Sequence, residues 1–251
     1  MDMQLNGPKI LYTFHTGTFL GDLNITQTLV MSWIILILIS GLCIWLGHGL
    51  KVENISKRQA VAEMLVNLLD NFVHGNMGAA FNQYIPLVGA LFATSIVSNL
   101  ISLLGFWSPT ADLSTEAAWA IVVFVLITYH KIRAGGPGQY LLGYLKPIFV
   151  MAPINVISEL ATPVSMACRH FGNILSGMVI STLIYSALAA ANAALFGLLP
   201  GVVGDVLGAI PFLDVGVPAV TSLYFDWFSG CIQAFIFCTL TTIYIKQAAE
   251  G

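Results

Sequence analysis

Charged side chains are scarce in this 251-residue sequence, in which Asp, Glu, Lys and Arg together make up only 8%. A soluble domain carries about 25% charged residues. Hydrophobic residues make up 57% of the chain, and its mean hydropathy is +0.87. So little charge excludes a soluble globular protein. It predicts a polytopic membrane protein, folded as one integral membrane domain over residues 1–251.

Several motifs that mark catalytic or transport classes are also missing. The sequence has no Walker loop, glycine-rich nucleotide fingerprint or zinc spacing, and no internal repeat of the kind found in inverted-repeat transporters. The four cysteines lie in apolar runs without paired spacing, which favours packing residues over a metal site or a disulfide. Residues 1–24 lack the pattern of a cleavable signal peptide. We therefore expect no metal, no cofactor and no nucleic-acid partner.

Long apolar runs, in contrast, are abundant, and about 20 residues suffice to cross the hydrocarbon core of a bilayer. After an external arm at residues 1–24, the sequence predicts membrane helices at residues 25–46, 84–104, 117–130, 148–194 and 218–245. The fourth run holds Pro153 and Pro163 and is too long for one perpendicular helix, so it must tilt strongly, break or form two pieces. The fold class is an all-α membrane protein with about five passes.

One further segment, residues 56–73, has the pattern of an amphipathic helix. Its apolar residues recur at helical spacing between polar ones: Val61, Leu65, Leu68, Leu69 and Phe72. A helix lying in the membrane interface has this pattern. A helix that packs on another subunit has it equally, and both interpretations stay open.

Basic residues predict the orientation of the chain, because cytoplasmic loops are enriched in Lys and Arg. With five passes, one side of the membrane holds Lys51, Lys57, Arg58, Lys131, Arg133, Lys146 and Lys246. Only Lys9 falls on the other side. We therefore expect the N-terminus outside and the C-terminus in the cytoplasm.

Arg169 is the only charged residue between Glu159 and Asp205. A charge in hydrocarbon costs about 2.5–3.5 kcal/mol on insertion scales, and arginine cannot lose its proton to escape that cost. A charge kept in such a place indicates a functional site and needs an anionic partner from outside its own segment.

Polar residues line one face of each of the last two predicted helices. The fourth helix carries Arg169, Asn173 and Ser176 at i, i+4 and i+7, beside Gly172 and Gly177. The last helix carries Ser222, Asp226, Ser229 and Gln233 at i, i+4, i+7 and i+11. We expect Asp226 to meet water from outside and Gln233 to lie about 10 Å deeper, near the depth of Arg169.

These stripes predict an ion path, because an isolated carboxyl exchanges protons and a fixed positive charge blocks the passage of cations. Asp226 is equally the type of residue that pairs with a Lys or Arg of another helix, or with Arg169 itself. Glu159 is expected either to line an inner access channel or only to mark the interfacial end of its helix. Asn173 and Gln233, taken alone, are typical of hydrogen bonds between helices.

Three segments resemble subunit a of the bacterial F-type ATP synthase. PVSMACRHFGN is similar to the family signature PxSLxxRLFGN, and IQAFIFCTLTTIYI is similar to the signature of the family's last helix. SNLISLLG, at residues 98–105, is similar to its NLxxLLP stretch. The resemblance extends over residues 80–247, in order and at family-like spacing.

The resemblance implies a non-catalytic, ion-translocating stator subunit of the plasma membrane. It implies a c-subunit ring, a peripheral stalk of subunit b and the remaining synthase subunits as partners, with the last two helices tilted against the ring. Arg169 matches the invariant arginine, which pairs in turn with each ring carboxylate and prevents a short circuit between two half-channels. Asn173 and Gln233 match the asparagine one turn on and the glutamine that faces the arginine.

Some residues depart from the family pattern. Met178 and Asp226 stand where some members have a glutamate or histidine of the outer half-channel, so Asp226 is expected to keep the one titratable group there. Ser102 stands where some members have aspartate. His170 replaces the usual leucine, and we expect a packing role for it.

Two other classes compete with this interpretation. An ion-coupled secondary transporter is the alternative function, and a membrane scaffold is the third, but neither accounts for both signatures. The sequence leaves open whether the ion is H⁺ or Na⁺.

Overall fold

The structure is a computed structural model that describes residues 7–15, 23–145, 148–196, 220–221 and 223–250. Ser222 and the beginning of the predicted helix at residues 218–245 lie outside these ranges, as do parts of the predicted external arm.

The first described elements form a small antiparallel hairpin, which the sequence analysis did not predict. Strand β1 (Ile10–Phe14) pairs with β2 (Leu23–Thr26), with an irregularity in the register between Ile10 and Tyr12. β-Branched and aromatic residues favour extended backbone, and both strands contain them. Thr26 ends the hairpin and caps α1 (Gln27–Gly47), because its hydroxyl accepts the backbone N–H of Leu29.

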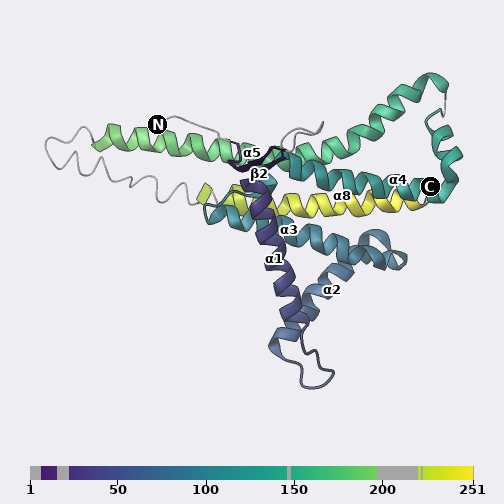
Figure 1. Cartoon of the computed structure of the whole chain (residues 1–251), viewed down its shortest axis with the longest axis horizontal. Coiled ribbons are helices and arrows are strands. Elements are labelled where there is room, and N and C mark those ends of the chain that lie inside the picture. The colour runs from purple at the N-terminus through teal and green to yellow at the C-terminus, as the bar shows by residue number, and fades with distance from the viewer. Residues whose placement is uncertain (1–6, 16–22, 146–147, 197–219, 222, 251) are drawn as a thin grey trace.

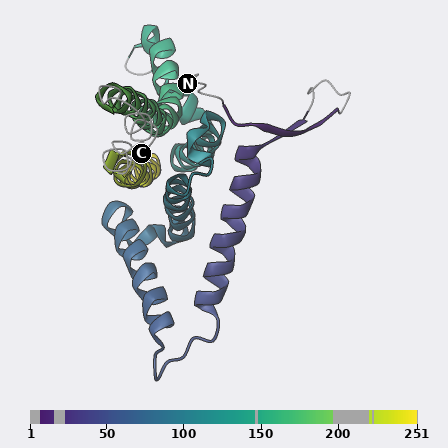
Figure 2. The same cartoon turned by 90° about the vertical axis from the view of Figure 1, so that its left-hand side faces the viewer.

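Helices α1 and α2 splay apart from the rest of the molecule. They form a V joined at its tip by residues 48–56, and α1 crosses the remaining bundle at a steep angle (Figure 2). Helix α2 (Lys57–Met77) begins at Ser56, whose hydroxyl accepts the Gln59 N–H at 3.2 Å. Its first turns expose apolar side chains, whereas Val73 and Met77 near its end are buried.

Helix α2 is followed by the short helix η1 (Ala79–Tyr84), which connects it to the main bundle. Four long helices of the described chain run side by side in this bundle. They are α3 (Ile85–Leu103), α4 (Leu113–Gly143), α5 (Ala152–Phe196) and α8 (Gly230–Glu250), shown in Figure 1. The short turns η2 (Pro109–Ala111) and η3 (Phe149–Met151) precede α4 and α5. A π-helical segment, η4 (Leu223–Ser229), runs directly into α8.

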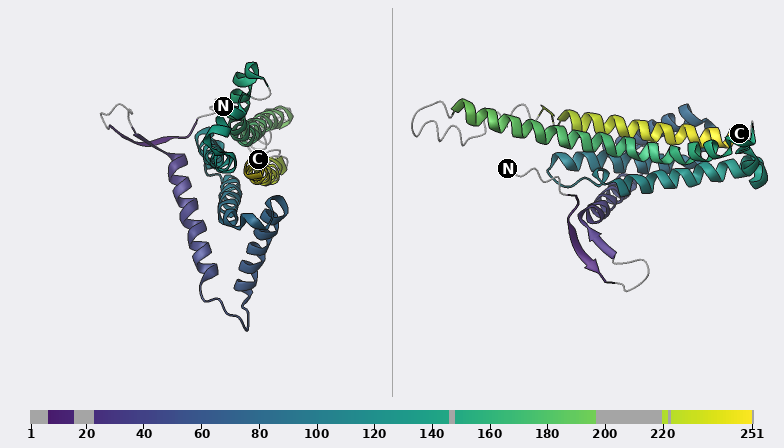
Figure 3. Two further views of the ribbon diagram at one scale, coloured as in Figure 1. Left: turned by 90° about the vertical axis from the view of Figure 1, so that its right-hand side faces the viewer. Right: turned by 90° about the horizontal axis from the view of Figure 1, so that it is seen from above.

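Helix α8 occupies the centre of the core. Its buried Phe237, Cys238 and Ile245 pack with Val88 of α3 and Val123 of α4. In a bilayer the lipid tails are as apolar as these side chains, so close van der Waals packing between the helices, and not transfer from water, holds this core together. Viewed from above, α5 and α8 lie alongside each other over much of their length (Figure 3).

Within the residues that the structure describes, five helices are long and apolar enough to cross a membrane: Gln27–Gly47, Ala79–Leu103, Leu113–Gly143, Phe149–Asn192 and Leu223–Glu250. The predicted all-α class with about five passes is therefore confirmed. The glycine-rich run follows the third predicted span, residues 117–130. It interrupts the helical backbone of α4 at Gly136, whose positive φ of 78° is favourable only for glycine. Helix α5 passes through Pro163 as one 45-residue helix, so of the predicted options it does not split into two pieces.

Candidate functional site

Arg169 lies on α5 and is exposed on the outside of the bundle. Among the side chains that the structure describes, none forms an ion pair with its guanidinium. Exposed apolar side chains occur on the same two helices, among them Val164 of α5 and Ile232 of α8. A guanidinium within a membrane-spanning helix needs an anion, and the described part of this chain does not supply one.

The two polar stripes meet through one hydrogen bond. Asn173 Nδ2 of α5 donates to Ser229 Oγ at 2.7 Å, at the junction of η4 and α8. Both residues are half-buried. The bond brings one member of each stripe together where α5 meets the end of η4, one helical turn from Arg169.

The other residues of the stripes lie near this contact without closing a continuous network. Ser176 is exposed, and its hydroxyl donates to the Asn173 carbonyl at 2.9 Å within α5. Gln233 is half-buried one turn after Ser229 on α8. The backbone of Asp226 lies in η4, but its side chain and all of Ser222 are outside the described parts of the structure.

The π-helical backbone of η4 changes the spacing of the last stripe. An α-helix brings residues i and i+4 to one face, whereas π-helical bonds join i to i+5 and widen each turn. The stripe was predicted from α-helical spacing, which does not hold across Leu223–Ser229. Ser229, at the end of that segment, is the stripe residue seen to contact α5.

Glycine allows α5 and η4 to approach closely beside this contact. A Cβ at Gly177 would lie 3.1 Å from the Cβ of Phe225, tighter than an ordinary contact. A Cβ at Gly172, on the turn between Arg169 and Ser176, would meet nothing within 4 Å. Gly177 thus packs within the chain, while Gly172 lies on the open face with Arg169.

Glu159 lines a cleft of about 830 Å³ between α4, α5 and the end of α8. Its Oε1 lies 2.9 Å from Lys131 Nζ and accepts the Tyr140 hydroxyl at 3.1 Å. Tyr144 hydrogen-bonds Tyr140, and burial together with the nearby Glu159 carboxylate raises the pKa of Tyr144. The sequence analysis identified Glu159 as a candidate site residue. It did not predict that Lys131 and Tyr140 surround it, because these residues lie on α4 and sequence spacing does not show which helices are neighbours.

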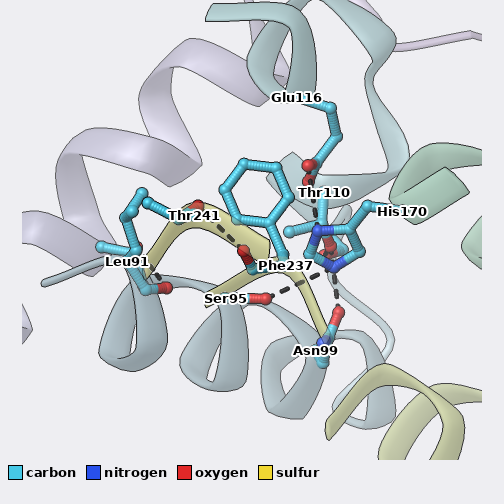
Figure 4. A network of polar contacts seen from close by, with 10 residues as sticks. Leu91, Ser95, Asn99, Thr110, Glu116, His170, Phe237 and Thr241 are labelled. Atoms are coloured by element: carbon cyan, nitrogen blue, oxygen red, sulfur yellow. Dashed lines mark hydrogen bonds and ion pairs between the residues drawn. The ribbon is translucent and has the colours of Figure 1, made fainter. Parts of the chain in front are cut away.

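A second polar cluster lies inside the bundle, and the sequence analysis missed it. Glu116 and His170 are almost fully buried, with Glu116 Oε2 3.0 Å from His170 Nδ1 (Figure 4). His170 also packs between the rings of Trp119 and Phe237, as a packing residue would. The sequence analysis did not single out Glu116, which lies just before the membrane helix predicted at residues 117–130.

Comparison with known proteins decides the family. Residues 29–246 match the family described as ATP synthase A chain. The chain belongs to this family. The resemblance drawn from the two signatures is therefore confirmed.

Individual relatives of the ATP synthase A chain family align with most of the chain. An "ATP synthase subunit a 1" of Prosthecochloris aestuarii is 31% identical over 235 residues, which cover 92% of this chain and 93% of that protein. Another "ATP synthase subunit a 1", from Crocosphaera subtropica, is 34% identical over 90% of this chain and 87% of its own length. "ATP synthase subunit a, sodium ion specific" of Propionigenium modestum is 29% identical over 96% of this chain and 85% of its own.

Proposed function

We propose that this chain is the membrane stator subunit that passes ions to and from the rotating ring of an F-type ATP synthase. Membership of the ATP synthase A chain family supports a non-catalytic, multi-pass subunit that works within that complex. The observation that carries the site assignment is Arg169: it is exposed on α5, within a membrane-spanning helix, and forms no ion pair among the side chains described.

Arg169 is the group that faces the carboxylates of the c ring. A permanent buried ion pair would lock the ring, because breaking such a pair by removing one partner costs about 3–5 kcal/mol. An exposed guanidinium beside polar Asn173 and Ser176 instead pairs with a carboxylate that has just lost its ion and releases it when the next ion arrives. The open space over Gly172 leaves room for a ring helix to approach.

Two access routes lead to this face. Asp226, Ser222, Ser229 and Gln233 line the outer route along the last helix. Glu159 lines the inner route, where the cleft beside Lys131 supplies a polar mouth. The offset between the routes forces the ring to turn before an ion can leave. The membrane field then supplies about 2.3 kcal/mol per charge per 100 mV, so several ions drive each ATP.

The remaining assignments follow from the sequence. The excess of Lys and Arg on one side supports an outer N-terminus and a cytoplasmic C-terminus in a bacterial plasma membrane. Subunit b is the partner we assign to the peripheral stalk. The chain is one integral membrane domain, with α2 either in the interface or against another subunit.

ATP-driven ion pumping in membranes that carry the whole complex tests the site assignment. We expect Arg169→Ala to abolish pumping while the complex assembles normally, because the substitution removes the fixed charge that we place opposite the ring. Pumping at the wild-type rate would contradict the stator role of Arg169 and would favour a membrane scaffold. A variant of Ser186, whose hydroxyl bonds only the Thr182 carbonyl of its own helix, is the control.

The same vesicles identify the ion. Pumping that requires Na⁺ and resists a protonophore would assign sodium, whereas pumping that collapses with the protonophore and ignores Na⁺ would assign the proton.

A further inference from the structure

The buried cluster around Glu116 lies at the end of the bundle where α3 ends and α4 begins. Glu116 is in the first turn of α4 and is 0% exposed, and His170 of α5 is 1% exposed. His170 lies between two partners, with Nδ1 3.0 Å from Glu116 Oε2 and Nε2 3.3 Å from Ser95 Oγ of α3. Figure 4 shows these side chains converging from three helices.

Electrostatics limits the charge that this pair holds. A lone buried charge costs several kcal/mol, so the pair is most stable when it is neutral overall. Neutrality requires one titrating proton, placed either on the Glu116 carboxyl or on the His170 ring beside it. The pair is therefore a site for a single exchangeable proton.

Several polar atoms of these residues lack hydrogen-bond partners. Both carboxylate oxygens of Glu116, His170 Nδ1 and Asn99 Nδ2 are buried and have no hydrogen-bond partner among the described residues. An unsatisfied buried polar group costs roughly 1–3 kcal/mol, and such groups are rare in native proteins. Asn99 Oδ1 is occupied, because it accepts the hydroxyl of Thr110 at 3.0 Å. Glu116 Oε2 faces His170 Nδ1 at 3.0 Å as an ion pair, so Oε1 is the carboxylate oxygen left to take up a proton.

The cluster adjoins the Arg169–Asn173 face from inside the bundle. His170 follows Arg169 on α5, so its ring points inward while the guanidinium is exposed. The Asn99 side chain packs directly against Gly230, because a Cβ added to Gly230 would lie only 2.6 Å from Asn99 Nδ2. Gly230 follows Ser229, the acceptor for Asn173.

The other titratable groups that the structure describes on the neighbouring helices are few, and they include the half-buried Cys231 next to Gly230 on α8. Helix α3 has none in its sequence, and Asp112 next to α4 is bound to the backbone and hydroxyl of Ser114. On α8, the Cys238 thiol contacts the Val88 carbonyl, and Lys246 lies in the last turns, near the opposite end. Arg169 is the one neighbouring fixed charge on α5.

We propose that Glu116 and His170 form the proton-exchange site of the outer access route, which rests on the proposed stator function. Glu116 gives up its proton to a ring carboxylate: the O–H bond at Oε1 breaks and an O–H bond forms on the ring. The emptied pair carries one negative charge, and a proton from water on the outer side refills it. One proton enters for each one that leaves, and Ser95 holds the His170 ring in place.

The test uses the whole complex in proteoliposomes, with the catalytic head outside so that the lumen represents the outer side. ATP synthesis is measured at fixed external pH while lumenal pH is varied and a potassium diffusion potential keeps the total driving force constant. The variants are Glu116→Gln and His170→Gln. The matched control is His130→Gln, since His130 is also buried but hydrogen-bonds Tyr84.

We expect Glu116→Gln and His170→Gln to lower synthesis per assembled complex about tenfold or more and to flatten its dependence on lumenal pH. In His130→Gln, ATP synthesis should depend on lumenal pH as it does in the wild type. A uniform loss at every lumenal pH, with the shape unchanged, would overturn the proposal and leave the pair as a structural contact. If Glu116→Gln does not assemble, Glu116→Asp decides: a shifted midpoint supports the exchange site, and an unchanged midpoint overturns it.

Two results distinguish a failure of this proposal from a failure of the proposed stator function. Wild-type synthesis that follows lumenal Na⁺ and ignores lumenal pH would overturn the exchange site and leave the stator role intact. Synthesis that persists in Arg169→Ala would instead contradict the stator role.

Discussion

Asn173 of α5 donates a hydrogen bond of 2.7 Å to Ser229, at the point where η4 becomes α8. The two residues are 56 positions apart in the chain, and they join the polar stripes of the two helices that carry the candidate ion path. The bond fixes α8 beside the turn of α5 that presents Arg169.

Ser229→Ala removes the acceptor of this bond. Because both residues are only half-buried, water replaces part of the lost interaction, and we expect a loss of about 0.5–1.5 kcal/mol in the stability of the α5–α8 contact. ATP-driven pumping should fall severalfold with the complex assembled. Ser186→Ala, which removes only a bond within α5, should pump at the wild-type rate. Equal pumping by the two variants would refute a role for the Asn173–Ser229 bond.

Gly230→Ala tests the close contact between α8 and α3. The added methyl would lie 2.8 Å from Asn99 Cγ, so either the Asn99 side chain or the helices must shift, and overpacking of this kind costs about 1–3 kcal/mol. We expect a lower thermal unfolding midpoint for the purified complex. Gly41→Ala in α1, where a Cβ meets nothing within 4 Å, is the control and should leave the midpoint unchanged or slightly raised. A midpoint as high in Gly230→Ala as in the control would contradict the packing described.

Glu159→Gln tests the inner route. The substitution removes the negative charge that Lys131 and Tyr140 contact, while keeping the shape of the side chain. We expect slower ion transport in both directions. Lys131→Gln should alter the free energy of unfolding by only about 0–1 kcal/mol, because that lysine is partly exposed. Transport by Glu159→Gln at the wild-type rate would assign Glu159 to the helix end alone.

The sequence was sufficient to find Arg169, because an isolated charge in a long apolar run stands out without any knowledge of its neighbours. Hydropathy likewise predicted five membrane-crossing helices. Periodicity shows which residues share a face of one helix, but not which face of another helix lies opposite. The contact between Asn173 and Ser229 therefore had to come from the structure.

The contact between Glu116 and His170 also could not be predicted from periodicity within single helices. They are 54 positions apart, one in the first turn of α4 and the other in the middle of α5. Glu116 follows a polar loop and precedes the helix predicted at residues 117–130, and only the structure shows that its side chain is fully buried. The π-helical turn of η4 was also invisible, because hydrophobic pattern does not distinguish it from an α-helix.

The most direct test of the central claim is the ratio of ATP made to ions passed by proteoliposomes that contain the Arg169→Ala complex under an imposed ion gradient. The account predicts that ions still cross but that no ATP is made, since the ring carboxylates no longer meet the fixed charge that couples passage to rotation. ATP synthesis at the wild-type ratio would show that Arg169 does not couple ion flow to rotation.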